Sequence, residues 1–388
     1  MVQLGRSRYT RTLPSCLLAL STGLRFCDTQ LRHPIWQSSP SPRSQTLVKA
    51  VPAQARATGG KSVRLAGTAW QLAGLVALML TLCPPSALAN STLEPEARRI
   101  YSIGDLHGDY TSTSEILRSL GLMGGSGEWS GGTALLVQTG DITDRGDESG
   151  QIFRTLFRLQ DEAPHSGGKV ILLLGNHEIM NLANDFRFAT NKDTASVVPA
   201  GTVSNASSRA AAFSTDGWLG QAIRQRLQAL AVIGPEEGLQ TPVLFVHAGL
   251  LPEFVEDKTT QIEVQLNGDV KKVISGNASD LQQESSSLIG ESGPFWTRRL
   301  ALGAENEACQ DVQRTLRAVG ASRMVVGHTA QADGRIRARC GGSLLLGDSL
   351  ISKFYTGTAH PSALEFFSDG SAAAIYPQSG RHVALPKP

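Results

Sequence analysis

Cysteine is scarce in the larger part of the chain. Of five cysteines in the sequence, three lie in the first ninety residues, which leaves only Cys309 and Cys340. Two cysteines in a segment of about 300 residues exclude a small scaffold held together by disulfides. The pair flanks the segment "RMVVGHT", so a bond between them would close a loop of about 30 residues. Two interpretations stay open: a disulfide, which an oxidising compartment would permit, or two separate thiols.

Acidic residues are almost absent from the first ninety residues. Asp28 is the only acid there, among ten Lys and Arg side chains. An Arg- and Ser-rich leader with few acids is typical of an organelle transit peptide. The apolar run "LAGLVALMLTLCPPSALAN" follows, preceded by Lys61 and Arg64, and it resembles a secretory signal. Residues 1–90 are therefore predicted to be a transit peptide plus a hydrophobic signal-like segment, with cleavage after Ala89.

A membrane anchor over Leu72–Leu82 is the alternative interpretation of the apolar run. A spanning helix needs about 20 apolar residues, and Pro84 and Pro85 interrupt this run. We therefore expect no stable membrane anchor once the leader is cleaved. Two signals in series predict import into a chloroplast and then transfer to an inner compartment, the thylakoid lumen. No Arg-Arg pair precedes the apolar segment, which favours a Sec-like route, with retention in the stroma as the alternative.

Clusters of basic side chains are absent after Asn90. Removing the ten basic and one acidic residues of the leader from totals of 36 and 34 leaves 26 and 33, so a whole-chain charge of +2 becomes −7. Nucleic-acid binding depends on phosphate neutralisation by clustered Lys and Arg. We therefore expect no nucleic-acid partner. About 300 residues are enough for one large domain with its own core, and we assign that domain to residues 95–380.

Short apolar runs recur along this domain and predict buried strands. Each is rich in Leu or β-branched residues and is bounded by Gly, Asp or Pro. The runs are "RIYSIGD", "ALLVQTGD", "KVILLLGN", "PVLFVHAG", "RMVVGHT", "SLLLGDS" and "ALEFFSD". Between the second and third, Ile152, Leu156 and Leu159 recur at helical spacing and predict a crossover helix. Strands that alternate with helices predict an α/β fold.

Two stretches interrupt this alternation. They are Asn191–Arg209, rich in Ala, Ser, Thr and Val, and Glu253–Ser287, in which Asn267-Gly268 predicts a hairpin turn. Both are expected to lie outside the core, where such excursions often form the rim of a site.

Polar side chains that can bind metal follow five of the predicted strands. They are Asp105 and His107, Asp141 and Asp144, Asn176 and His177, His247, and His328. A single one of these is more often an ordinary polar residue at the end of a strand. The carboxyl ends of strands in an open α/β sheet lie on one side, however, so residues distant in sequence can converge there. All five groups together indicate a site.

The types of these residues fit two metal ions held close together. Asp105 and His107 are two residues apart, so in an extended chain their side chains point the same way and can bind one ion. Asp141 is a carboxylate that can bridge both ions. Neutral ligands for the second ion are His247, His328 and the amide oxygen of Asn176. Mixed histidine, carboxylate and amide ligands suit Mn, Fe or Zn better than Ca.

The motifs resemble the phosphoprotein phosphatase branch of the calcineurin-like metallophosphoesterases. The matching segments are, in family order, "GDLHG", "GDITDRG", "GNHE", "HAG" and "GHT". The further segments "HEIMNL", "FWTRR" and "LLLGDSLISKFYTG" look most like the Shewanella-like protein phosphatases. The resemblance covers most of Arg98–Tyr376. It implies a central β-sandwich flanked by helices, with a dinuclear metal site at the strand ends.

The resemblance also implies how the metal ions are held and used. Asp105, His107 and Asp141 would hold the first ion. The ligands implied for the second ion are Asp141, Asn176, His247 and His328. Two such ions, about 3.5–4 Å apart, lower the pKa of a bridging water and hold the phosphoryl oxygens for in-line attack. Mn is the expected metal, with Fe or Zn as alternatives.

Catalytic roles follow from the same resemblance. His177 would protonate the leaving oxygen, with Asp144 orienting its ring. Arg145 would clamp the phosphate bidentately; its alternative role is a surface ion pair with Asp147 or Glu148.

The sequence singles out three further residues near these motifs. Arg298 and Tyr355 are candidate substrate contacts, and a structural role is equally compatible with each. Glu178 is expected to support the site or begin a helix rather than bind metal.

Three functions are compatible with this site. The first is a protein phosphatase that acts on phosphoserine, phosphothreonine or phosphotyrosine. The second is a small-molecule hydrolase such as a dinucleotide polyphosphatase, which shares the metal motifs. The third is an inactive metal-binding scaffold, which is disfavoured because no ligand or acid is missing. The segments after His177 and His247 do not resemble those of the eukaryotic protein phosphatases, so the sequence supports catalysis better than any one substrate.

Overall fold

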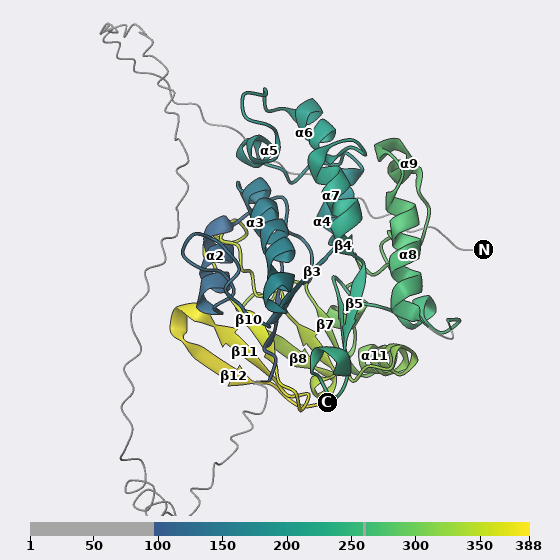
Figure 1. Cartoon of the computed structure of the whole chain (residues 1–388). Coiled ribbons are helices and arrows are strands. Elements are labelled where there is room, and N and C mark those ends of the chain that lie inside the picture. Colours follow the sequence, from purple (N-terminus) through teal and green to yellow (C-terminus); the bar gives the residue numbers. More distant parts are fainter. Residues whose placement is uncertain (1–96, 259–260) are drawn as a thin grey trace, which may run out of the picture. The chain divides into compact units, whose positions relative to one another are not determined.

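A computed structural model describes residues 97–258 and 261–388, so the leader and signal-like segment predicted for residues 1–90 lie outside the described residues. Two β-sheets and the helices around them make up the described part (Figure 1). Within it, no helix combines the length and apolar character needed to cross a bilayer.

The first sheet has seven strands in the order β12-β11-β10-β1-β2-β3-β4. Strands β1 to β4 are parallel to one another, whereas β10, β11 and β12 extend the sheet in antiparallel fashion. The strands are β1 Ile100–Ile103, β2 Leu135–Gln138, β3 Lys169–Leu173, β4 Leu227–Gln228, β10 Ala363–Phe366, β11 Ala372–Tyr376 and β12 Arg381–Ala384. Strand β12 carries the sheet past residue 380, the boundary assigned from the sequence.

The second sheet has five strands in the order β5-β6-β7-β9-β8. Its three central strands are parallel, and the two edge strands are antiparallel to them. The strands are β5 Leu230–Ile233, β6 Val243–Val246, β7 Arg323–Val326, β8 Arg337–Arg339 and β9 Leu344–Leu346.

Helices surround the two sheets (Figure 1). The α-helices are α2 Tyr110–Ser119, α3 Ser149–Glu162, α4 Asn176–Leu182, α5 Asn191–Val197, α6 Ala206–Phe213, α7 Trp218–Arg226, α8 Ile262–Ile274, α9 Ala278–Gln283, α10 Arg299–Leu302 and α11 Glu305–Val319. The 3-10 turns are η1 Ala163–Ser166, η2 Pro235–Glu237, η3 Pro252–Phe254, η4 Cys340–Gly342 and η5 Pro377–Ser379.

Successive side chains of each strand point to opposite faces of its sheet, so each sheet packs against the other sheet on one face and against helices on the other. Leu135 and Val137 of β2 pack between the sheets with Phe245, whereas the intervening Leu136 packs on the helical side with residues of α3. The second sheet alternates in the same way, because Val325 faces the first sheet and its neighbours face α8 and α11. Strands buried on both faces read as continuous apolar runs, which is why the sequence predicted seven of the strands: β1, β2, β3, β6, β7, β9 and β10. The predicted α/β sandwich with flanking helices is confirmed.

Two details of the sequence-based expectation are wrong. Asn267-Gly268 does not form a hairpin turn but lies inside α8. Asn267 Oδ1 accepts the backbone N–H groups of Ala229 and Leu230 at 2.7 and 3.2 Å, so tertiary hydrogen bonds outweigh the turn preference. Both excursions also contribute to the interior, where none was expected. Asn191–Arg209 contains helix α5 and ends on a fully buried arginine, and Glu253–Ser287 contains α8, whose Leu266 and Val270 belong to the core.

Candidate metal centre

The candidate site lies where parallel strands of both sheets end. Asp105 and His107 follow β1, the segment from Asp141 follows β2, and Asn176 begins α4 directly after β3. The second sheet supplies one histidine after β6 and another after β7, His247 and His328. The carboxyl ends of parallel strands point the same way, so five loops from two sheets converge.

The backbone of the site adopts conformations that are costly away from glycine. Five of the nine non-glycine residues with positive φ in the described segments belong to the candidate site. They are His107, Asp141, Asp144, Arg145 and His328. Such conformations persist where the surroundings over-determine them, and they cluster at functional sites. Asp141 also approaches the backbone at position 175 so closely that only glycine fits there, since a Cβ on Gly175 would lie 2.1 Å from Asp141 Oδ1.

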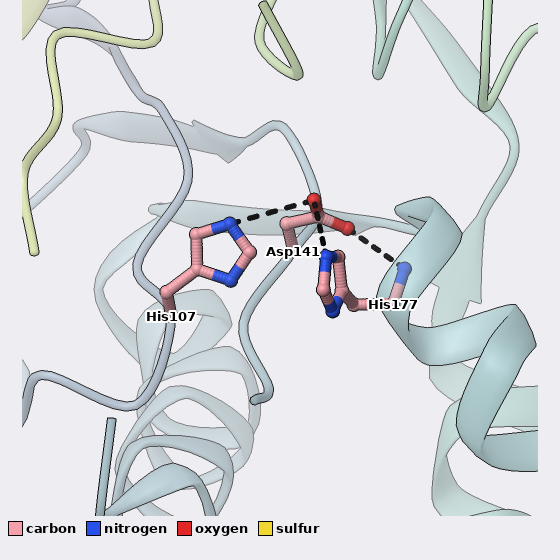
Figure 2. Close-up of side chains that lie close together, drawn as sticks. All are labelled: His107, Asp141 and His177. Atoms are coloured by element: carbon pink, nitrogen blue, oxygen red, sulfur yellow. Dashed lines mark hydrogen bonds and ion pairs between the residues drawn. The ribbon is translucent and has the colours of Figure 1, made fainter. Parts of the chain in front are cut away.

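Asp141 stands at the centre of the site, and Figure 2 shows the rings of His107 and His177 converging on its carboxylate. Its Oδ2 atom lies 3.4 Å from His247 Nε2, 3.6 Å from His107 Nε2 and 4.0 Å from His177 Nε2. Asp105 Oδ2 lies 4.0 Å from His107 Nε2. A carboxylate surrounded by three imidazoles has the position that a bridging ligand requires.

Each predicted histidine ligand uses one ring nitrogen to bind a backbone carbonyl. The pairs are His107 Nδ1 with Thr143 at 3.1 Å, His247 Nδ1 with Thr139 at 2.8 Å, and His328 Nε2 with Trp296 at 3.1 Å. A carbonyl oxygen only accepts, so that nitrogen carries the proton and the opposite nitrogen is left for the site. Second-partner hydrogen bonds of this kind fix the tautomer and orientation of metal-binding histidines.

Burial and charge set the protonation of these rings differently. Burial lowers the pKa of His107 and of His328 to about 3, assisted by the positive charges of His177 and His247 respectively. Both rings are therefore neutral at pH 7, as metal binding requires. Burial opposes protonation of His247 too, but the Asp141 carboxylate outweighs it and raises its pKa to about 10.

The donor set fits divalent metal ions. His107, Asp141 and His177 present ligand atoms within 4.8 Å of one another, and Asp141, His247 and His328 do the same. The Asn176 amide oxygen lies 3.1 Å from His247 Nε2 and completes the second group. Asp348, which the sequence analysis did not single out, has a buried Oδ2 without a hydrogen-bond partner. Burial, together with the negative charge of Asp348, raises the pKa of Asp105 well above its usual value.

His177 is held by a buried carboxylate. Its Nδ1 donates to Asp144 Oδ2 at 2.8 Å, and its backbone N–H donates to Asp141 Oδ1 at 3.0 Å. Burial opposes the charged ring, but Asp141 and Asp144 outweigh that cost and raise the pKa of His177. With Nδ1 engaged, Nε2 is the atom turned toward Asp141. The structure therefore brings together the residues predicted as the acid and its orienting partner.

Arg145 lies between two aromatic rings at the edge of the site. Its guanidinium carbon is 4.5 Å from the ring centre of Phe188 and 4.3 Å from that of Tyr355. Its buried Nε has no hydrogen-bond partner. Asp147, a predicted alternative partner, instead pairs with Lys192 at 3.5 Å. The cation–π contacts hold the guanidinium while its donors stay available for an anion.

The two other candidate substrate contacts touch predicted metal ligands. The Tyr355 hydroxyl lies 2.9 Å from His107 Nε2. Arg298 Nη1 donates to the backbone oxygen of His328 at 2.9 Å and to Thr329 Oγ1 at 3.3 Å. Tyr355 thus reaches the centre itself, whereas Arg298 supports the loop that carries His328.

Glu178 organises the loop after β2. Its buried carboxylate accepts four backbone N–H groups at 2.8 to 3.1 Å. The donors are Gly175, Asp141, Ile142 and Thr143. This agrees with the expectation that Glu178 supports the site rather than binding metal.

The sequence analysis missed several residues around the site. Asn181 and Arg209 bind Asp144 directly, Phe188 packs on Arg145, and the Trp296 carbonyl orients His328. Asn181 lies four residues after His177 on the same helix, a spacing that could have revealed it. No local pattern marks the others, because their contacts span long sequence distances.

Cys309 and Cys340 form a disulfide, with Cα atoms 5.2 Å apart. The bond joins α11, which precedes β7, to η4, which follows it. It therefore connects both flanks of the strand that ends near His328. Of the two interpretations left open by the sequence, the structure selects the disulfide.

The sequence profile of the calcineurin-like phosphoesterase family matches residues 98–331. The chain belongs to this family. The match includes every predicted metal ligand described above. Family membership and phosphatase-named relatives together make the chain a metallophosphatase.

Relatives of the chain include two eukaryotic proteins and a bacterial structure. An uncharacterized protein of Schizosaccharomyces pombe is 33% identical over 66% of this chain and 74% of its own length. Shewanella-like protein phosphatase 2 of Arabidopsis thaliana is 29% identical over 71% of this chain and 77% of its own. The crystal structure of a cold-active protein-tyrosine phosphatase of a psychrophilic Shewanella species superposes with a TM-score of 0.61. It covers 74% of this chain and 80% of its own, at 22% identity. That likeness supports the fold.

Proposed function

We propose that this chain is a protein phosphatase that hydrolyses phosphoserine, phosphothreonine or phosphotyrosine. The observation that carries the proposal is the pair His177–Asp144 beside the Asp141 centre, with Arg145 at its edge. An acid, an anion-binding cation and a metal-binding centre are the three parts that phosphomonoester hydrolysis needs. When bound, two divalent ions, which we propose to be Mn with Fe or Zn as alternatives, polarise the phosphoryl group and activate water.

Side chains of the protein bind the phosphoryl group and donate the proton. Arg145, held between two rings, binds the phosphoryl oxygens through its guanidinium. His177 carries a proton on Nε2 and delivers it to the leaving oxygen of the substrate side chain. Asp144 holds Nδ1, so the proton-bearing Nε2 keeps its direction. Tyr355 packs on Arg145 and limits where the phosphate can lie.

A surface cavity beside the centre supports a polypeptide substrate. Its volume is about 630 Å³, and it lies between the end of α4 and the segment after α9. Met180 and Trp296 line it, and the same residues contact Asn176 and His328 in the centre. A cavity separated from the centre by these two side chains is close enough to receive the residues that flank a phosphorylated side chain. The phosphatase names of relatives point the same way.

A substrate panel tests the proposal. The purified protein with added Mn is offered phosphoserine, phosphothreonine and phosphotyrosine peptides and, in parallel, a dinucleotide tetraphosphate. We expect phosphate release from at least one peptide class and its loss on chelation. Turnover of the dinucleotide alone would favour the small-molecule hydrolase. Full metal occupancy without turnover of any substrate would favour the inactive scaffold.

A further inference from the structure

A fully buried arginine lies behind the acid of the site. Arg209, the fourth residue of α6, has no exposed surface and belongs to the stretch that interrupts the α/β alternation. Helix α6 packs against α4, which carries His177 (Figure 1). A buried guanidinium is stable only when its donors are satisfied, so its partners reveal what it does.

Those partners are the residues that hold His177. Arg209 Nη2 donates to Asp144 Oδ1 at 2.9 Å and to Thr143 Oγ1 at 3.2 Å. The other oxygen of Asp144 accepts His177 Nδ1 at 2.8 Å. One carboxylate oxygen is thus fixed by the arginine, and the other faces the imidazole.

Arg209 also determines how Asn181 contributes. Its Nε donates to Asn181 Oδ1 at 2.8 Å. A guanidinium can only donate, so the amide oxygen must face Arg209 and the amide nitrogen must face away. That nitrogen donates to Asp144 Oδ2 and to the His177 carbonyl, both at 2.9 Å. The arginine therefore acts on Asp144 twice, directly and through Asn181.

The remaining nitrogen of the Arg209 guanidinium, Nη1, binds a second buried carboxylate. Nη1 donates to Asp193 Oδ2 at 3.0 Å, and Asp193 Oδ1 accepts the Ser149 N–H at the start of α3 at 2.8 Å. Arg209 is thereby bound directly to α4 and α5, and to α3 through Asp193. A planar fork with five donors can do this, whereas a lysine ammonium acts as a point charge.

We infer that Arg209 is a positioning residue for the His177–Asp144 pair. It fixes the Asp144 carboxylate and the Asn181 amide so that His177 directs Nε2 at the leaving oxygen. The inference rests on the proposed function in one respect, the role of His177 as proton donor. The positioning itself is a property of the folded chain.

Leaving-group dependence tests the inference, because protonation matters most for a poor leaving group. Arg209→Met should lower kcat for phenyl phosphate by about tenfold or more, and kcat for p-nitrophenyl phosphate by less than about threefold. KM and metal content should stay close to wild type. The loss of kcat in Arg209→Lys should lie between that of wild type and that of Arg209→Met. Arg323→Met is the matched control, because Arg323 is equally buried but binds only the backbone oxygens of Gly342, Gly370 and Pro386. It should affect both substrates equally.

A second variant protects the test against misfolding. Arg209→Met alone leaves the buried Asp193 carboxylate without its cationic partner. Arg209→Met combined with Asp193→Asn removes that negative charge and keeps an acceptor for the Ser149 N–H. The double variant should show the same leaving-group dependence. Equal losses on both substrates in both variants would overturn the inference.

A signal independent of turnover separates this inference from the proposed function. In the metal-free protein, the proton on His177 Nδ1 should give a downfield proton resonance, assigned by its loss in His177→Ala. The resonance should shift or broaden in the Arg209→Met variants and persist in Arg323→Met. An unchanged resonance would refute positioning by Arg209. A wild-type protein that hydrolyses neither the aryl phosphates nor any of the phosphopeptides would instead refute the proposed function, and the resonance would still decide the inference.

Discussion

The Tyr355 hydroxyl donates to His107 Nε2 at 2.9 Å, the nitrogen that faces the predicted metal position. The lone pair used in this hydrogen bond is the one that a metal ion needs, so the two interactions exclude each other. Tyr355 therefore lies where it must move or turn its hydroxyl when the first ion binds. The same ring packs on Arg145, so movement of Tyr355 would also affect the guanidinium that we propose to bind the phosphate.

Tyr355→Phe should strengthen binding of the first metal ion. The phenyl ring retains its packing on Arg145, while the competing hydrogen bond disappears. A net hydrogen bond is worth about 1 kcal/mol, which corresponds to roughly a fivefold gain in affinity. Titration calorimetry with Mn measures the change. Unchanged or weaker binding in Tyr355→Phe would show that the hydroxyl does not compete with the ion.

His177→Ala should retain metal and lose rate. Removing a general acid typically costs about 10²–10⁴-fold, so kcat on a phosphopeptide should fall by that factor. Asp105→Asn and His247→Ala are the contrasting variants, since each should lose bound metal as well as activity. Turnover and metal content are measured on the same samples. Near-normal peptide turnover by His177→Ala would rule out its role as the acid. An activated aryl phosphate is a weaker substrate for this test, because its leaving group needs less protonation.

Local sequence patterns predicted the parts of the fold that obey local rules. Strands buried on both faces appear as apolar runs, and all seven predicted runs contain a strand. The seven runs did not include β4, β5, β8, β11 and β12. Strands β8 and β12 lie at sheet edges, and polar residues such as Arg337 and Arg381 leave them without an apolar run. Strand β4 has only two residues, whereas β5 and β11 are apolar strands that the sequence analysis overlooked. The hairpin turn predicted at Asn267-Gly268 was wrong for another reason, since the Asn267 side chain accepts a hydrogen bond from Leu230 at the start of the distant strand β5.

The candidate site shows the same division between local and distant information. Residues that could bind metal were visible because each ends a strand, and strand ends converge by topology. Arg209 could not be predicted, because its role comes from contacts with residues as distant as Thr143. These contacts depend on how helices pack, which no local spacing encodes. Roles that depend on the second layer of contacts therefore required the structure.

Reduction of the Cys309–Cys340 bond should destabilise the protein. The bond spans 31 residues, and the chain-entropy estimate for such a loop is about 3–4 kcal/mol. Chemical denaturation with and without reductant measures the difference. Cys309→Ser/Cys340→Ser should match the reduced wild type and should not respond to reductant. Titration of the native protein should reveal two new thiols after reduction. Equal stability in both redox states would contradict the prediction.

Processing of the leader predicts the amino terminus of the mature protein. We propose that a plastid transit peptide is followed by a signal for the thylakoid lumen, with cleavage after Ala89. Sequencing the amino terminus of the protein isolated from its cells should therefore give a start near Asn90. A start before Lys61 would mean that the apolar segment is retained. Between these outcomes, a start between Lys61 and Leu72 would also keep that segment and contradict full processing.

Metal binding should release a proton from His247, and affinity should rise with pH. In the metal-free protein the pKa of His247 is raised to about 10, so the ring is protonated at pH 7 although its nitrogen is needed by the ion. The proton must leave before the metal binds, and one released proton makes affinity change by about tenfold per pH unit below that pKa.

Calorimetry of Mn binding in buffers of different ionisation enthalpy counts the released protons. At Mn concentrations high enough to saturate its weakened site, the His247→Ala variant should release about one proton fewer than wild type at pH 7. His328→Ala is the matched control: its pKa of about 3 means that the ring holds no proton to release at pH 7. That variant should bind metal more weakly without changing the proton count. Equal proton release by wild type and His247→Ala would show that His247 is already neutral in the metal-free protein.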